Sequence, residues 1–358
     1  MIYRRPSYYD TFHCLGGACP DTCCRDWSVV PDEDALADYA SAPSPLRERI
    51  AQNLAADEDG DVCFRLDGEG QCTLLTPDGL CAIQRDWGEA HLCAHCAAYP
   101  RFIEEFGCLT ESSLAISCRS AARLLIEAPR FALIETDDGQ NEPPFEDIDP
   151  DLLAGLEHSR AQVLALLNGE GPIWSRLRAM LDYAQALQAA IDGEACPQMA
   201  ACPPPVLPAA PTAPVRLQAS SVRFLRLLAS LDPLRPGWPP LLETRAAALA
   251  ALPRRDYLQQ RAQYHQANPR WEQQLTNLAC YLVFRHWHKA VNDDLLYGRA
   301  AFVCAACTTL YHLSLFQTGE EAALWTRFSR EVEHDEDNLA ELIWSLADPK
   351  AHPPRSLL

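Results

Sequence analysis

Apolar residues recur at helical spacing through the second half of the chain. Leu, Ile, Met and Trp follow a period of about 3.6 residues from Leu152 to Asp192, and the segment GEGPIW at 169–174 interrupts the pattern with turn-forming residues. The sequence therefore predicts two helices joined as a hairpin. Further stretches carry the same periodicity: residues 220–231, 241–252, 271–291, 294–316 and 320–347. Together these segments predict a helical bundle.

The first 135 residues have a different pattern, with short apolar stretches separated by turn signals. DGEG at 67–70 and PDGL at 77–80 are such signals, and a small hairpin is expected at 62–75. We expect metal ligands to hold this part together as much as its own core does.

Two segments are predicted to be connections between domains and not helices or strands. Residues 135–151 are acidic and contain three prolines, and residues 196–214 contain seven prolines, which cannot continue a helix. The predicted domains are therefore a cysteine-rich module at 1–135, a connecting region with the helical hairpin at 136–216 and a helical bundle at 217–358. The fold class is mainly α, with a cysteine-rich, loop-rich metal-binding N-terminal module packed on a C-terminal helical bundle.

Composition is that of an ordinary soluble globular protein, with 48% hydrophobic and 22% charged residues. The N-terminus lacks the apolar region of a secretion signal, and no run of apolar residues has the length of a membrane span. We expect a cytoplasmic protein with no membrane partner. In that reducing compartment, a dense set of cysteines is typical of metal or redox sites and not of disulfides.

The cysteines are concentrated at the N-terminal end of the chain. Of 16 in total, 11 lie within residues 1–118, and four of these fall between Cys14 and Cys24. Thiolates suit both zinc and iron–sulfur clusters. Zinc sites usually show two C-x2-4-C pairs, whereas Cys93 and Cys96 form a single clean pair here, so the dispersed spacing favours iron–sulfur while zinc stays open.

A formal net charge of −19 excludes nucleic acid as the expected partner, because phosphate binding needs a positive surface. A basic or lysine-bearing protein is the more suitable partner.

Several ordered blocks of the sequence resemble the flagellin lysine-N-methylase family. They begin with CPDTCCRDWSVV, GQCTLLTPDGLCAIQRDWGEAHLCAHCAAYPRF and SLAISCRSAARLLI, and continue with YLVFRHWHKAVNDDLLYGRAAFV and FSREVEHDEDNLAELI in the helical part. The resemblance implies an iron–sulfur protein, with a 4Fe-4S cluster, that methylates lysine side chains of flagellin with S-adenosylmethionine as donor. It also implies eight metal-ligating cysteines: Cys14, Cys19, Cys23, Cys24, Cys72, Cys81, Cys96 and Cys118. Cys63, Cys93 and Cys108 lie outside the family pattern.

The sequence leaves the role of the metal and the donor site open. Methyl transfer to a neutral amine is a direct displacement that needs no metal, so the cluster is either structural or part of an unusual radical mechanism. The usual radical spacing C-x3-C-x2-C is absent, and no G-x-G-x-x-G follows a predicted strand. Tyr99 and Arg101, next to Cys96, are candidates for contact with the cofactor or the amine; the alternative is loop packing.

Two motifs in the helical part are candidates for catalysis. Glu331, His334 and Asn338 have the spacing of one helix face, and Glu-x-x-His also occurs in di-iron bundles, although only one such motif is present. Arg285 belongs to RHWH in another predicted helix. A shared pocket lined by Arg285, Glu331 and His334 is one interpretation, and a buried ion-pair network is the other.

Three functions remain open on the sequence. The first is a lysine methyltransferase acting on flagellin. The second is a metal-binding or metal-handling protein without catalysis, and the third is an electron-transfer or redox-sensing protein.

Overall fold

A computed structural model describes the chain except for residues 58–59, 141–144, 147 and 210–212. It is mostly helical, with 57% of residues in helices and 9% in strands, which confirms the mainly α class. Parts of the predicted acidic connection and of the proline-rich linker fall on residues 141–144, 147 and 210–212 and lie outside the described residues.

The chain forms two compact units. We call Thr11–Phe102 with Leu114–Ala122 the thiol unit, and Met1–Asp10, Ile103–Ser113 and Arg123–Leu358 the helical unit. The first residues of the chain belong to the helical unit because they form a strand in its sheet. The boundaries expected at residues 135 and 216 stay predictions.

A mixed four-stranded sheet, which the sequence patterns did not predict, lies mostly in the helical unit. Its strands are β1 (Ile2–Pro6), β4 (Arg101–Glu105), β5 (Leu109–Leu114) and β6 (Leu133–Asp137), in the order β4-β5-β1-β6. Tyr3 of β1 is opposite Thr110 of β5 in a parallel register and opposite Thr136 of β6 in an antiparallel one. Pairing across more than 100 residues of sequence places β1 inside the sheet.

The helical hairpin predicted from periodicity is confirmed as α6 (Pro150–Leu167) and α7 (Ile173–Asp192). Asp149 caps α6, since its carboxylate accepts a hydrogen bond of 2.8 Å from the amide of Asp151. The other predicted helical segments also form, but helix α10 (Arg254–Ala267) was not expected. The remaining elements of this unit are η4 (Cys196–Ala201), α8 (Pro214–Ala229), α9 (Trp238–Ala251), α11 (Trp271–His286), η5 (His288–Val291), α12 (Leu296–Phe316), α13 (Glu321–Phe328), η6 (Ser329–Glu333), α14 (Glu336–Leu346) and α15 (Pro354–Leu357).

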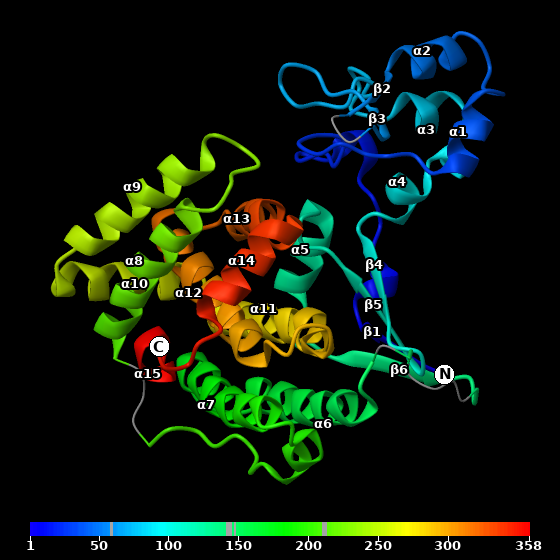
Figure 1. Cartoon of the computed structure of the whole chain (residues 1–358). Helices are drawn as coiled ribbons and strands as arrows, with labels where there is room; N and C mark the ends of the chain where they lie inside the picture. Colours follow the sequence, from blue (N-terminus) through cyan, green and yellow to red (C-terminus); the bar gives the residue numbers. More distant parts are fainter. Residues whose placement is uncertain (58–59, 141–144, 147, 210–212) are drawn as a thin grey trace. The chain divides into compact units, whose positions relative to one another are not determined.

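Helix α12 forms the core of the helical unit, surrounded by other helices in Figure 1. Within the described residues it is the one helix with the length and hydropathy of a membrane span, but 94% of its apolar window is buried inside the protein. It approaches α14 closely at Gly298, where a Cβ atom would lie 2.5 Å from the carbonyl oxygen of Ile343. Burial on all sides explains its uniformly apolar sequence.

The segment expected to be one helix at 320–347 is broken. It continues from α13 into a π-helical turn, η6, and then leaves the helix at Asp335, whose side chain caps α14 by accepting a hydrogen bond of 2.9 Å from the amide of Asn338. The prediction that Glu331, His334 and Asn338 share one helix face is therefore wrong, because the backbone between them is not continuous helix.

The thiol unit consists of short elements around a small core. They are η2 (Gly16–Ala18), α1 (Glu33–Tyr39), α2 (Leu46–Gln52), β2 (Leu54–Ala56), β3 (Val62–Phe64), α3 (Ala82–Asp86), η3 (Glu89–His91) and α4 (Ala94–Ala98). β2 pairs antiparallel with β3, so the hairpin of two strands lies at 54–64 and not at the expected 62–75. An isolated bridge joins Leu66 to Cys72 within the expected range. Helix α5 (Arg119–Glu127) begins in this unit and ends in the helical unit.

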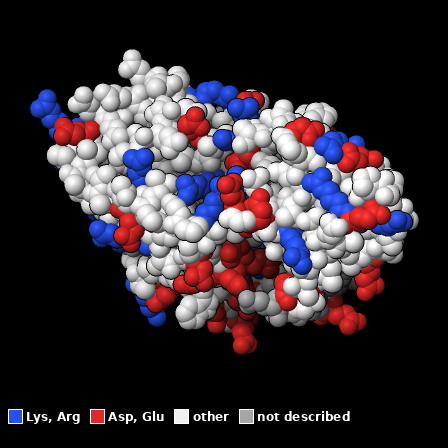
Figure 2. Space-filling model, turned by 90° about the horizontal axis from the view of Figure 1, so that it is seen from above, with Lys and Arg blue, Asp and Glu red and all other residues white. Residues whose placement is uncertain are grey.

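Charged side chains of both signs lie on the face drawn in Figure 2. Acidic groups outnumber basic ones over the whole chain, with 49 Asp and Glu against 30 Lys and Arg. The surface therefore repels polyanions and attracts basic ligands at long range.

Candidate metal centre and buried polar networks

All 16 cysteines are described, and all are free thiols. The eight cysteines predicted as metal ligands all belong to the thiol unit, where Cys63 and Cys93 also lie, whereas Cys108 belongs to the helical unit. Tertiary structure thus gathers the predicted ligands into one compact part of the chain.

One group of thiols surrounds the loop that contains η2. The amide of Gly16 donates to the Cys14 sulfur at 3.4 Å, and Cys19 closes the turn by donating its amide to the carbonyl of Gly16 at 3.0 Å. The hydroxyl of Ser120 donates to the carbonyl of His13 at 3.2 Å, which joins the start of α5 to this loop. Cys118, two residues before Ser120, is thereby brought to the same place.

Electrostatic interactions agree with this grouping. A hydrogen bond with Cys24 and burial raise the pKa of Cys23, and the charges of Cys14 and Cys118 add to the effect. Burial raises the pKa of Cys118, with a further contribution from Cys19 and Cys14. We call Cys14, Cys19, Cys23 and Cys118 the first thiol group.

A second group gathers around the small core of the unit. The amide of Cys72 donates to the carbonyl of Cys24 at 2.9 Å, and a β-bridge joins Leu75 to Cys81. Cys72, Cys81 and Cys96 pack against the hydrophobic cluster that contains buried Cys93.

Charge interactions connect the same residues. Burial raises the pKa of Cys72 to about 11, and the charges of Cys24 and Cys81 contribute. The hydrogen bond with Cys93, burial, and the charges of Cys93, Cys24 and Cys81 raise the pKa of Cys96. We call Cys24, Cys72, Cys81 and Cys96 the second thiol group.

Burial raises the pKa of Cys72, Cys81 and Cys118, and backbone amides two and three residues later act in the opposite direction. The amides are those of Leu74 and Leu75 for Cys72, Ile83 and Gln84 for Cys81, and Ser120 and Ala121 for Cys118. A nearby amide favours the thiolate, which is the form that binds metal.

Two pairs of thiols are close enough to share a proton. The hydrogen bond from Cys23 lowers the pKa of Cys24 to about 7, and that from Cys96 lowers the pKa of Cys93 to about 7. Free thiols, amide donors and paired sulfurs in one loop-rich unit fit a thiolate-ligated metal group.

The four sulfurs of a tetrahedral zinc site lie close together. Zn–S bonds of about 2.3 Å in a tetrahedron place the sulfurs about 3.8 Å apart. Among the described residues, the group of three ligand atoms found within 4.8 Å of one another is Glu111, Glu157 and His288, and no three cysteine sulfurs lie that close together.

Glycines allow the loops that carry the thiols to meet. A Cβ atom on Gly17 would lie 2.4 Å from the carbonyl oxygen of Asp78, and Gly79, with a φ of +77°, lies against Gly17 in turn. Only glycine permits this approach of the η2 loop to the turn before Cys81.

Tyr99 and Arg101 also lie in the thiol unit. The hydroxyl of Tyr99 is 3.1 Å from that of Ser117, next to Cys118, and its ring lies 5.8 Å from that of Trp27. Arg101 is exposed, with its guanidinium 5.3 Å from the centre of the Phe12 ring. Tyr99 thus connects the end of α4, which carries Cys96, to the residue before Cys118.

A buried polar network in the helical unit is centred on Glu333, which sequence reasoning missed. Its Oε1 accepts hydrogen bonds from Tyr281 at 3.0 Å and lies 3.2 Å from His286 Nε2 and 3.6 Å from Arg285 Nε. Its Oε2 accepts from the Ser329 hydroxyl at 2.8 Å. Burial alone raises the pKa of Glu333, but the hydrogen bond to His286 and the charge of Arg285 lower it to about 2.

The structure brings only two of the three predicted catalytic residues of this unit together. Arg285 also donates to the hydroxyl of Ser113 at 3.0 Å, and the charges of Glu333 and Arg285 both act on half-buried His334, whose pKa burial lowers. Glu331 instead accepts hydrogen bonds from the amides of Leu234 at 2.9 Å and Arg235 at 3.3 Å. Glu333, two residues further along the π-helical turn, takes the position beside Arg285.

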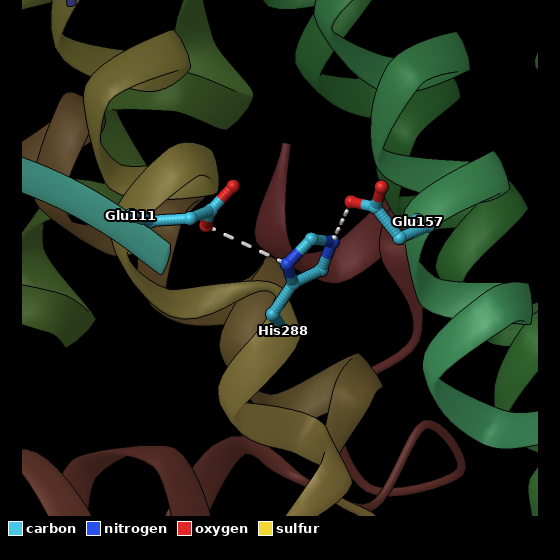
Figure 3. A group of neighbouring side chains, drawn as sticks. All are labelled: Glu111, Glu157 and His288. Atoms are coloured by element: carbon cyan, nitrogen blue, oxygen red, sulfur yellow. Dashed lines mark ion pairs between the residues drawn. The ribbon is translucent and has the colours of Figure 1, made fainter. Parts of the chain in front are cut away.

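A second buried network lies around His288. Its Nε2 is 3.0 Å from Glu157 Oε1 and its Nδ1 is 3.5 Å from Glu111 Oε2, as Figure 3 shows. These three side chains come from η5, α6 and β5.

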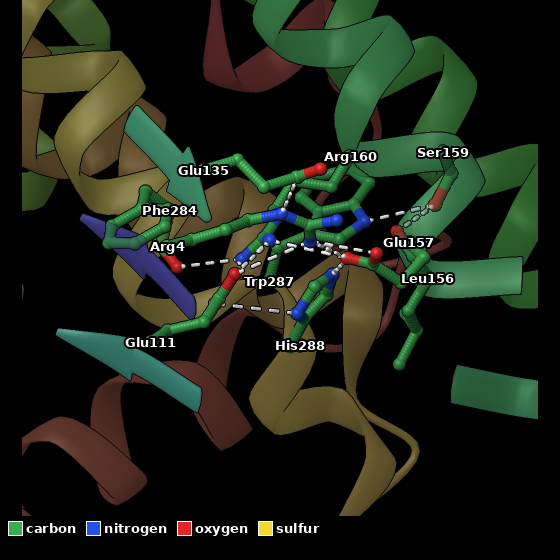
Figure 4. Close-up of polar contacts among 10 residues, drawn as sticks. All are labelled: Arg4, Glu111, Glu135, Leu156, Glu157, Ser159, Arg160, Phe284, Trp287 and His288. Atoms are coloured by element: carbon green, nitrogen blue, oxygen red, sulfur yellow. Dashed lines mark hydrogen bonds and ion pairs between the residues drawn. The ribbon is translucent and has the colours of Figure 1, made fainter. Parts of the chain in front are cut away.

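Arginine side chains form ion pairs with the carboxylates of this second network (Figure 4). Arg160 binds both oxygens of Glu111, at 2.6 and 2.5 Å, and Arg4 binds both oxygens of Glu157, at 2.6 and 2.7 Å. A divalent cation would have to displace two guanidinium groups from already neutralised carboxylates. The geometry is therefore that of an ion-pair network and not of a metal site.

A small cavity between α10, α11 and α12 is lined mainly by aromatic side chains, including Tyr264, Trp271 and Tyr311. Its volume is about 10 Å³, which is room for about one water molecule. A nucleoside-sized donor does not fit there.

Comparison with known proteins gives distant and partial relatives. The chain is 27% identical over 141 residues to proteins named lysine-N-methylase from Salmonella typhimurium and from Salmonella choleraesuis. It is 26% identical over 134 residues to the flagellar biosynthetic protein FliU of Salmonella muenchen. No family model and no solved structure matches the chain significantly.

These matches cover a limited part of each protein. The chain spans about a third of the length of the lysine-N-methylases, 35%, with 38% of its own residues matched, and 79% of the length of FliU with 36% matched. Over that part of its sequence the chain is a distant homologue of proteins named for lysine methylation and for flagellar biosynthesis.

Proposed function

We propose that this protein is an iron–sulfur methyltransferase that transfers a methyl group from S-adenosylmethionine to lysine side chains of flagellin. The observation that carries the proposal is the homology to proteins named lysine-N-methylase and FliU. The gathering of eight free thiols in one compact unit is the expected setting for the metal.

The dispersed spacing of the cysteines along the sequence, with Cys93 and Cys96 as the single C-x2-C pair, favours iron–sulfur over zinc. A reducing cytoplasm keeps these thiols available as ligands.

Methyl transfer to lysine is a displacement at carbon. The amine nitrogen forms the new bond to the methyl carbon, the carbon–sulfur bond breaks, and its electron pair stays on sulfur as a neutral thioether. The lysine must first lose its proton, and a water-poor channel favours this by disfavouring the ammonium form. The cluster, when bound, would supply cross-links that hold the thiol unit together.

The residues predicted as catalytic remain candidates, each within its own unit. In the helical unit these are Arg285 and His334 around Glu333, and Glu331 in the same π-helical turn as Glu333. Tyr99 is a candidate for contact with the amine, and Arg101, which is exposed, for binding the carboxylate of the donor.

The test is methyl transfer by the purified protein. We expect about four iron and four sulfide per chain as a minimum after anaerobic preparation. Incubation with S-adenosylmethionine should then add methyl groups to lysines of purified flagellin, read by peptide mass spectrometry. Reactions without donor, and with the donor's demethylated product in its place, are the controls. No methylation of flagellin under reducing or oxidising conditions contradicts the proposal.

A second function has one observation in its favour. Cys93 is 1% exposed, and Cys72, Cys81 and Cys96 pack against the same hydrophobic core, as expected where a metal only stabilises a fold. On this alternative the protein binds or handles metal without catalysis. Full metal content together with absent methyl transfer is the result that favours it.

A further inference from the structure

The eight predicted ligand thiols divide into two spatial groups rather than forming one. The first group is assembled from two chain segments, the loop around η2 and the start of α5. The hydrogen bond of 3.2 Å between Ser120 and the His13 carbonyl fixes these segments together. Cys14 follows His13 and Cys118 lies two residues before Ser120, so this bond brings both thiols to the loop that also carries Cys19.

The second group is assembled from other segments. The backbone bond of 2.9 Å between Cys72 and Cys24 places these residues side by side, and Cys81 and Cys96 pack with Cys72 around the core of the unit.

The two groups meet at consecutive residues. Cys23 ends the segment that runs from Cys14 through Cys19, whereas the carbonyl of its neighbour Cys24 accepts a hydrogen bond of 2.9 Å from the amide of Cys72. The dipeptide Cys23–Cys24 therefore contributes one sulfur to the first thiol group and one to the second.

We infer that the thiol unit holds two separate metal centres with four thiolates each. The first centre is ligated by Cys14, Cys19, Cys23 and Cys118. The second centre is ligated by Cys24, Cys72, Cys81 and Cys96.

Cys93 has a different part in this arrangement. It is 1% exposed within the hydrophobic cluster. Cys96 is less buried and packs against this cluster, as Cys72 and Cys81 do. Cys93 is thus a supporting neighbour of the second centre, and Cys96 is the ligand.

This inference shares with the proposed function only the premise that the thiols bind metal. The experiment therefore measures metal and not methyl transfer. Wild-type protein, prepared anaerobically, is analysed for iron, acid-labile sulfide and zinc. Two centres correspond to about eight iron and eight sulfide, to about four of each with one zinc, to two zinc, or, where each centre is a 2Fe-2S cluster, to about four iron and four sulfide with the absorption and EPR spectra of 2Fe-2S clusters. Two zinc retain two centres while contradicting the iron–sulfur proposal. About four iron and four sulfide with the spectra of a 4Fe-4S cluster and no zinc, or one zinc alone, overturns the inference.

A pair of adjacent substitutions tests the ligand assignment. Cys23→Ser should remove the first centre and Cys24→Ser the second, so each variant keeps about half of the metal and the double variant keeps none. Cys14→Ser should reproduce the metal content and absorption spectrum of Cys23→Ser, and Cys81→Ser those of Cys24→Ser. Loss of all metal from each single variant, with the fold retained by circular dichroism, would show one shared centre and overturn the inference.

Variants that fail to fold leave the wild-type metal count as the deciding measurement. Two control variants complete the set. Cys63→Ser alters a thiol that donates to the carbonyl of Ala55 at 3.5 Å in the β2–β3 hairpin and should keep full metal. Cys93→Ser should also keep both centres, and loss of the second centre in this variant but not in Cys96→Ser would overturn the assignment of Cys96.

Discussion

At the scale of single residues, Glu333 determines the buried network of the helical unit. Four side chains converge on its carboxylate, and it is 6% exposed. Removing one partner of a buried charged pair leaves the other charge uncompensated, which is more costly than the pair itself is stabilising. The network therefore makes a sharp stability prediction.

Glu333→Ala should lower the free energy of unfolding by about 3–5 kcal/mol, because the Arg285 guanidinium would be left buried without its carboxylate. Urea unfolding followed by circular dichroism measures this. Glu341→Gln, an exposed change on α14, should stay within about 0.5 kcal/mol of the wild type. Equal stability of Glu333→Ala and Glu341→Gln would show that the network contributes nothing.

His286 predicts a dependence of stability on pH. Burial lowers its pKa from 6.5 to about 4, although its hydrogen bond to Glu333 acts in the opposite direction. The unfolded chain therefore takes up this proton first, and the free energy of unfolding falls as pH decreases from 6.5 toward 4. Urea midpoints at several pH values should show this fall, and His286→Gln should flatten it. A slope unchanged in His286→Gln contradicts the assignment.

His334 is the residue on which the catalytic proposal is most easily tested. It is half-buried beside Glu333 and Arg285 at the end of η6, and π-helical turns are frequent at functional sites. His334→Ala should lower methyl transfer to flagellin at least about tenfold, which is about 1.4 kcal/mol of transition-state stabilisation, without changing iron content. Normal turnover in this variant would make His334 structural and direct attention to Tyr99 and Arg101.

At the scale of elements, one carboxylate organises two helices of the thiol unit. Asp32 Oδ1 accepts from the amide of Ala35 at the start of α1, at 3.0 Å, and its Oδ2 accepts from Ala94 at the start of α4, at 2.7 Å. These amides lower the pKa of Asp32. Helix α4 carries Cys96, so Asp32 connects helix capping to the thiols.

Asp32→Ala should accelerate loss of metal to a chelator, because the start of α4 would no longer be fixed to α1. The rate of loss of the cluster's visible absorption with excess chelator is the measurement. Asp34→Ala, an exposed change in the same turn, is the matched control and should behave as the wild type. Identical rates for Asp32→Ala and Asp34→Ala would show that the bond to Ala94 does not hold the thiol group.

At the scale of the whole molecule, the excess of acid over base is the dominant long-range feature. A net charge of −19 attracts lysine-bearing surfaces, and salt screens this attraction over a Debye length of about 10 Å at 0.1 M. The KM for flagellin should therefore rise between low and physiological ionic strength, while kcat changes little. Initial rates over a range of salt concentrations test this, and a KM independent of salt contradicts an electrostatic contribution.

The sequence was sufficient to predict helices wherever apolar residues followed a long, regular helical spacing. Helices α6 and α7 have 18 and 20 residues, with apolar spacing maintained throughout and a glycine-containing turn between them. Helix α10 was not predicted because its sequence is polar and lacks an apolar stripe. Its buried residues are Tyr257 and Tyr264. The sheet was not predicted because its strands have only five or six residues and because β1 pairs with strands more than 100 positions away in the sequence.

The sequence by itself determined the concentration of thiols, with 11 cysteines within 118 residues, and the prediction of a metal site follows from it for the reducing compartment that we expect. Only the tertiary structure decided which thiols lie together and that Glu333, rather than Glu331, meets Arg285. Residue type and helical or strand periodicity are local properties that can be read from the sequence. Which side chains lie close together depends on loop closure, which brings distant segments together, and on backbone breaks such as the turn at Asp335, which direct neighbouring side chains to different places.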